Sequence, residues 1–273
     1  MPVITISRGS YSRGKEVAET VAARLGYECI SRDVLIEASE LFNIPEIRLV
    51  RAIHDAPSVL DRFHYGKERY VAFIRAALLR RVQQDNVVYH GLAGHFFLQN
   101  IPHVLKVRII ADMEDRVAEE MKRESISAEK ARAMLKKDDE ERRKWGLSLY
   151  GIDTADAGLY DMVLSIKTMD VEDVVDLIVS TVNRPGFHTT PESQQILDDL
   201  TLAAQVEIAL VEDFPKVRVT AAQGAVDVYL TVGLPRHKSR RENEIIRMVE
   251  DLAIQIGGAH EVRVHLSHSV MHD

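Results

Sequence analysis

The sequence predicts an α/β protein, in which a parallel sheet with helices on both faces is followed by a small α+β domain. Short apolar, β-branched runs alternate with helical segments of about ten residues or more, which is typical of parallel strands joined by helical crossovers. The pattern changes at residues 183–191, where two prolines and a glycine stand among polar residues. We therefore expect a first domain at residues 1–184, a linker at 185–191 and an accessory domain at 192–273.

The first domain is expected to open with a strand, a turn and a helix. Residues 3–6 are β-branched and predict a strand that is buried on both faces. Residues 7–14 are rich in Ser and Gly and predict a turn, and residues 15–25 place their apolar side chains on one side of a helix that ends at Gly26. The remaining expected elements are a helical stretch at 32–84 with breaks near 43–45 and 56–57, strands at 86–89, 104–111 and 160–164, and helices at 112–143 and 171–182.

The accessory domain is expected to have the order α-β-β-α-β, with its helices on one face of a sheet. Its elements are predicted as helices at 192–211 and 240–256 and strands at 217–220, 225–231 and 261–266.

Composition restricts the classes of protein to consider. Among 273 residues, 46% are hydrophobic and 28% charged, which is ordinary for a globular protein, and the net charge of -7 gives no reason to expect a nucleic-acid partner. A phosphate site must therefore be locally basic. The single Cys29 cannot form an internal disulfide, and no Cys/His cluster has zinc-ligand spacing, so we expect no protein-held metal. The absence of a leader pattern and of an apolar run of about 18 residues predicts a cytoplasmic protein without a transmembrane segment.

The turn after the first strand has the pattern of a phosphate-binding loop. Gly9, Gly14 and Lys15 satisfy the spacing G-x4-G-K, and Arg8 and Arg13 bring the cations to three within eight residues. Backbone N–H groups in such a turn converge on phosphate oxygens at the N-terminus of a helix. At the next position Glu16 replaces the usual Ser or Thr ligand of Mg²⁺. Glu16 is compatible with a contact to magnesium through water, or with a solvated acid in the first turn of the helix. For residues 7–14 as a whole, the alternative to a phosphate-binding loop is a basic βα connection without a ligand.

The same residues resemble the opening of the cytidylate kinase-like proteins, a family with the P-loop kinase-type fold. Ser7, Arg8, Ser12, Gly14 and Glu16 fall on the family pattern, so that Glu16 is a family trait. The resemblance extends in order through residues 31–33, 106–117, 136–142 and 159–164, and covers about residues 2–182.

This resemblance implies that the protein transfers the γ-phosphoryl group of ATP, with Mg²⁺, to a pyrimidine nucleoside monophosphate. It implies that Lys15, Asp139 and Arg142 are catalytic, Arg142 acting from a lid in which Arg143 is a further candidate. The residues it implies at ATP are Ser12, Arg13, Gly14, Lys15, Glu16 and Arg116, and those at the acceptor nucleotide are Arg8, Arg32, Asp33 and Gly91.

Three positions depart from the family pattern. Tyr11 and Arg13 stand where the family has glycine, and Leu92 stands where it has an arginine that binds the acceptor phosphate, for which His90 or His95 would have to compensate. These departures favour an alternative function, a nucleotide-binding sensor or scaffold with impaired catalysis.

The accessory domain resembles a BON-like module, at residues 223–230 and 257–262 and in its element order more than in its residues. Such modules are associated with attachment to membranes or proteins. A protein partner or a homodimer formed through this domain is therefore a third hypothesis, in which the kinase fold is a support.

Overall fold

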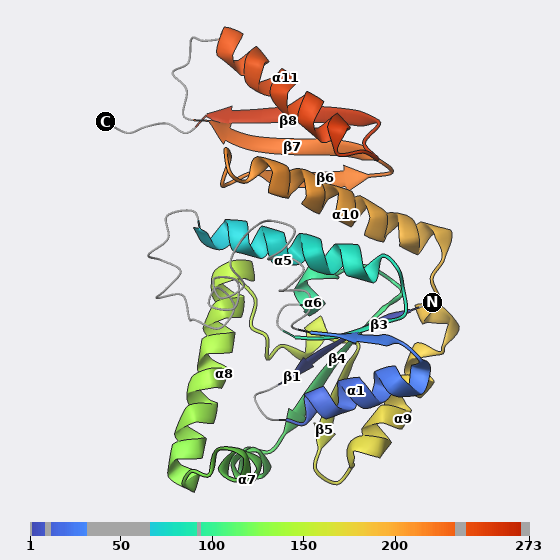
Figure 1. Cartoon of the computed structure of the whole chain (residues 1–273), viewed down its shortest axis with the longest axis vertical. Coiled ribbons are helices and arrows are strands. Elements are labelled where there is room, and N and C mark those ends of the chain that lie inside the picture. The colour runs from blue at the N-terminus through green and yellow to red at the C-terminus, as the bar shows by residue number, and fades with distance from the viewer. Residues whose placement is uncertain (1, 9–11, 32–65, 92–93, 233–238, 269–273) are drawn as a thin grey trace.

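The computed structural model describes residues 2–8, 12–31, 66–91, 94–232 and 239–268 (Figure 1). The first part of the chain forms a five-stranded parallel sheet with the strand order β2-β3-β1-β4-β5. The strands are β1 Val3–Arg8, β2 Glu28–Ile30, β3 Val87–His90, β4 Val104–Ala111 and β5 Met162–Ile166. The expected parallel sheet is therefore confirmed, and β2 is a short edge strand that the sequence pattern did not predict.

The register brings the carboxyl ends of the central strands to one edge of the sheet. Ile6 of β1 lies opposite His90 of β3, and Arg8 lies opposite Ile109 of β4. Ligands of open parallel sheets bind beyond this edge, because the connections that leave the strands there are free to surround a ligand.

Helices cover both faces of this sheet, as predicted (Figure 1). On one face, helices α1 (Gly14–Leu25) and α9 (Val171–Val182) enclose a core with the fully buried strand residues Ile4 and Ile109. On the other face lie α5 (Gly66–Val82) and the short α6 (Gly94–Phe97). Burying each large aliphatic side chain contributes about 1.5–3 kcal/mol, so both layers hold the strand ends in place.

The charged stretch expected as one helix at 112–143 forms two helices, α7 (Met113–Glu124) and α8 (Ala128–Tyr150). Ser125 ends α7 in the left-handed conformation with φ 53°, and the Ser127 side chain caps α8 by accepting a hydrogen bond from the Lys130 N–H. The pair is held together by a small apolar cluster around Val117 and Leu135. Helix α8 therefore turns back toward the carboxyl edge of the sheet (Figure 1).

The C-terminal part has the predicted order α-β-β-α-β and forms its own three-stranded sheet. Its elements are α10 Pro191–Leu210, β6 Arg218–Ala222, β7 Ala225–Val232, α11 Ser239–Gln255 and β8 Glu261–His268. The strand order is β6-β7-β8, with β6 antiparallel and β8 parallel to β7. Both helices cover one face, since Val206 of α10 and Val249 of α11 share a core with Val228 of β7.

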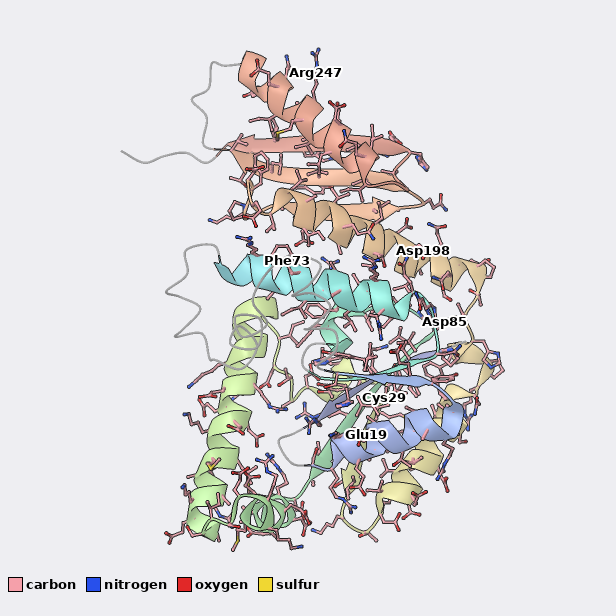
Figure 2. The ribbon with its side chains drawn as sticks, in the orientation of Figure 1. Glu19, Cys29, Phe73, Asp85, Asp198 and Arg247 are labelled. Atoms are coloured by element: carbon pink, nitrogen blue, oxygen red, sulfur yellow. The ribbon has the colours of Figure 1, made fainter. Side chains whose placement is uncertain are left out.

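Helix α10 joins the two sheets, because it packs along α5 as well as on its own sheet (Figure 1). One hydrophobic cluster runs from α5 through α10 to β7. Asp198 lies on the side of α10 that faces α5 (Figure 2) and accepts a 2.9 Å hydrogen bond from Gln83. Arg75 of α5 forms a 2.9 Å ion pair with Glu207. In the described part of the chain, no helix is long and apolar enough to cross a membrane.

Candidate functional site

A cavity of about 520 Å³ opens at the carboxyl edge of the five-stranded sheet. Strand β1 contributes Ser7 and Arg8, β3 is followed there by Gly91, and α6 and α8 close the sides. The charged lining residues are six cations, namely Arg8, Arg108, Arg116, Lys136, Arg142 and Arg143, and three acids, namely Asp139, Glu140 and Asp153. The cavity thus has an excess of three positive charges in a chain of net charge -7, as a phosphate site requires.

Two glycines keep the edge of the sheet open. A Cβ atom on Gly14 would lie 2.7 Å from Cβ of Arg8, so only glycine lets α1 begin this close to the end of β1. A Cβ atom on Gly91 would lie 2.5 Å from the Tyr89 hydroxyl oxygen. Both positions, which the sequence assigned to nucleotide binding, have a steric reason to remain glycine.

The start of α1 is tied down by its own side chains. The buried Ser12 hydroxyl donates a 3.1 Å hydrogen bond to the Ile109 carbonyl oxygen of β4. Arg13 takes the left-handed conformation, φ 59° and ψ 13°, and its guanidinium donates two 2.8 Å hydrogen bonds to Glu16. Lys15 is exposed and lies 3.5 Å from Glu19. The backbone N–H groups at the start of α1 and the positive end of its dipole are features that favour an anion.

Helix α8 reaches the cavity through three charged contacts. Arg142 donates a 2.8 Å hydrogen bond to the Arg8 carbonyl oxygen at the end of β1. The buried Arg116 of α7 forms a 2.9 Å ion pair with Asp139, and Arg143 pairs with Asp153 at 2.8 Å. Four residues that the sequence singled out, Arg8, Arg116, Asp139 and Arg142, therefore meet around one cavity, together with Gly91. Residues 12–16 lie beside it at the start of α1.

A hydrogen-bonded group around Tyr160 lies against the cavity, because its partners Ser7, His95 and Thr154 line it. The Tyr160 hydroxyl donates to the Thr154 carbonyl oxygen at 3.0 Å and lies 3.3 Å from both Ser7 Oγ and His95 Nε2. Because its one hydrogen is used on Thr154, the hydroxyl accepts from His95 Nε2–H. Burial, together with the nearby positive charge of Arg108, lowers the pKa of His95 to about 3, so its ring is neutral. His95 Nδ1 is then an acceptor, and it is buried where none of the described residues donates a hydrogen bond to it.

The sequence patterns missed Arg108 and Tyr160 as residues of this site. The available signal for Arg108 was a charged residue inside a run that otherwise predicts a buried strand, at residues 104–111. The predicted acceptor residues Arg32 and Asp33, and the departures Tyr11 and Leu92, lie outside the described residues. Among the described residues, no group of three His, Cys, Asp or Glu side chains is arranged to hold a metal ion.

Comparison with known proteins identifies the family. The model of the cytidylate kinase-like family matches residues 3–168. The cytidylate kinase of Sulfolobus acidocaldarius is 24% identical over 188 residues, which are 68% of this chain and 97% of that protein. The cytidylate kinase of Archaeoglobus fulgidus is 29% identical over 182 residues, or 66% of this chain and 93% of that protein.

One solved structure shows the same fold. It is the crystal structure of an uncharacterized protein from Eubacterium ventriosum, which is 19% identical, has a TM-score of 0.52, and aligns over 67% of this chain and 100% of its own. The family match covers well over half of the 273 residues and includes the strands and the helices α6, α7 and α8 that contribute to the cavity. The chain belongs to the cytidylate kinase-like family.

Proposed function

We propose that this protein transfers the γ-phosphoryl group of ATP to the phosphate of a pyrimidine nucleoside monophosphate, such as CMP. Membership of the family supports a nucleoside monophosphate kinase that uses ATP. The observation that carries the proposal is the excess of positive charge in the cavity beside the N-terminus of α1, with Arg142 of α8 reaching the end of β1. This arrangement suits a reaction in which positioning and charge stabilisation do most of the work.

The segment before α1 is proposed to hold the ATP phosphates. Backbone N–H groups of residues 12–15 would donate to phosphate oxygens, with the Lys15 ammonium at the terminal phosphates. Mg²⁺ usually binds through substrate phosphates, water and one or two carboxylates. The cavity fits this mode, because its few acids are outnumbered by cations and Asp139 retains partial exposure. Mg²⁺ would enter with ATP and neutralise phosphate charge.

The lid residues are proposed to act on the transferring group. An oxygen of the acceptor phosphate attacks the γ-phosphorus, and the bond to the ADP oxygen breaks. Arg142 would donate to the transferring oxygens, and Asp139 would hold Arg116 in place as α8 excludes water. Arg8, Arg32, Asp33 and Gly91 remain the proposed acceptor residues.

A coupled assay of ADP release with CMP, UMP, dCMP, AMP and GMP tests the proposal. We expect turnover with at least one pyrimidine nucleotide. ATP binding without turnover for any acceptor would instead support the sensor or scaffold. Lys15→Ala should weaken ATP binding at least tenfold, about the effect of one charge-assisted hydrogen bond, whereas Lys122→Ala, which removes a more exposed lysine of α7, should not.

We also propose that the C-terminal part is a BON-like interaction domain, in a protein that works in the cytoplasm. The observed order α10-β6-β7-α11-β8 supports this assignment, and the sheet face opposite the two helices, with the exposed Arg263 and His265, would receive a partner or a second copy. Sedimentation equilibrium of the full chain separates a monomer from a homodimer. A monomer at all concentrations would remove the dimer from consideration.

A further inference from the structure

Arg108 is a cation in the wall of the cavity that forms no ion pair with a carboxylate of the described residues, although its charge also acts on Asp153, which is paired with Arg143. It lies on β4 opposite Ser7 of β1, is partly buried, and lines the cavity. No carboxylate or carbonyl oxygen among the described residues accepts a hydrogen bond from its guanidinium, which lies over the Tyr160 ring, 5.5 Å from the ring centroid. By contrast, Arg116, Arg142 and Arg143 all have oxygen partners.

A partly buried guanidinium is costly without an acceptor, because it loses water and gains no hydrogen bond in return. Its planar set of five donors matches the oxygens of a phosphate group. The Tyr160 ring beneath it is fixed through the hydroxyl contacts with Thr154, Ser7 and His95. Tyr160 therefore holds Arg108 in a defined position before a ligand arrives.

The sheet geometry indicates which phosphate Arg108 meets. Side chains alternate between the two faces of a strand, and the next residue, Ile109, is buried in the core shared with Val17 of α1. Arg108 therefore points to the face that carries α6 and His95, opposite to the face of α1. The ATP phosphates are proposed at the start of α1, so Arg108 is placed for the other nucleotide.

We propose that Arg108 binds the phosphate group of the acceptor nucleoside monophosphate. This inference rests on the proposed kinase function and adds a substrate-binding residue to it. It also accounts for Leu92, because the positive charge that the family pattern has at position 92, after β3, would be supplied here from β4, on the other side of β1. The neutral His95 next to Arg108 adds no competing charge to this phosphate site.

The test compares Arg108→Ala, Arg108→Gln and Arg108→Lys with the wild type in steady-state kinetics, with CMP varied at saturating ATP and then the reverse. We expect the KM for CMP to rise about 10- to 100-fold in the Ala and Gln variants, the effect of losing a hydrogen bond to a charged group. The KM for ATP should stay within about twofold, and Arg108→Lys should recover part of the loss. Arg218→Ala is the matched control, since Arg218 stacks on Tyr229 in the second sheet, outside the cavity.

Calorimetric titration with CMP and with cytidine, which lacks the phosphate, gives a readout that a merely structural role would not move. The wild type should prefer CMP, and the Ala and Gln variants should lose most of that preference. The assignment would be overturned if the Ala and Gln variants kept the preference for CMP over cytidine, or if only their KM for ATP rose. If Arg108→Ala lacks a cooperative thermal transition, the Gln variant decides. Wild-type protein that binds no nucleoside monophosphate would overturn the proposed function as well, so the two failures are distinguishable.

Discussion

Lowering the pH from 7 to 5 should destabilise this protein through His95, a buried histidine that is neutral in the folded state. Its pKa is about 3 when folded, lowered by burial and then by Arg108, against an ordinary value of about 6.5 in the unfolded chain. Below pH 6.5 the unfolded chain therefore binds a proton that the folded chain excludes, and stability falls as the pH falls. For these two pKa values, the loss between pH 7 and pH 5 is about 2 kcal/mol.

Urea denaturation of the wild type and of His95→Gln at pH 7, 6 and 5 isolates this contribution. Acid also protonates carboxylates, and burial lowers the pKa of His103 as well, but both effects are present in the two proteins and cancel in their difference. We expect the wild type to lose about 2 kcal/mol more than the variant over this range. His188→Gln, at an exposed histidine, should keep the wild-type dependence. Parallel curves for the wild type and His95→Gln would refute the reasoning, because His95 would then titrate alike in both states.

Three further substitutions test the packing that supports the site. Arg13→Gly should be more stable than Arg13→Ala by about 1 kcal/mol in urea denaturation, because both variants lose the ion pair with Glu16 but only alanine keeps a Cβ at φ 59°. Equal stability of the two variants would argue against the left-handed conformation of residue 13. Gly14→Ala should lower the free energy of unfolding by about 1–3 kcal/mol and weaken ATP binding, since its Cβ would meet Cβ of Arg8 at 2.7 Å. The control Gly186→Ala, with open space around its Cβ, should leave the thermal denaturation unchanged. Arg75→Met should lower the free energy of unfolding by about 1–3 kcal/mol, because it leaves the Glu207 carboxylate buried without its cation. Adding Glu207→Gln should restore part of the lost stability. A double variant that is less stable than Arg75→Met would contradict this explanation.

Sequence patterns predicted the elements whose apolar periodicity is regular. Strand β4 at 104–111 and helix α9 at 171–182 have the predicted bounds, because each buries its apolar side chains in the same core. Strand β2 was missed because only Ile30 of its three residues is buried, which is too short a signal. The break between α7 and α8 was missed because residues 112–143 have helical spacing throughout, and the break depends on the backbone of Ser125 and the cap at Ser127.

In the candidate site as well, sequence patterns predicted some residues and missed others. Family motifs located Arg116, Asp139 and Arg142, which do meet at one cavity. Arg108 could not be found from a motif, because its significance depends on its contact with the ring of Tyr160, 52 positions further along the chain, and on the lack of an ion pair with any described carboxylate. Contacts between residues this far apart follow from strand order and register, which a local pattern does not contain.

The attachment of α10 to α5 makes the C-terminal domain part of the support of the first sheet. Helix α5 follows residues 32–65, which include the proposed acceptor residues Arg32 and Asp33, and α10 holds α5 through a shared hydrophobic cluster and the Arg75–Glu207 pair. Removing residues 185–273 would expose the side of α5 that faces α10 and leave Arg75 without its partner. Loss of activity after such a truncation would therefore not show that the domain binds a regulator, because α5 itself would be destabilised. A regulatory role is tested instead by substitutions on the open face of the second sheet, such as Arg263→Ala, since these leave the contact between α10 and α5 intact.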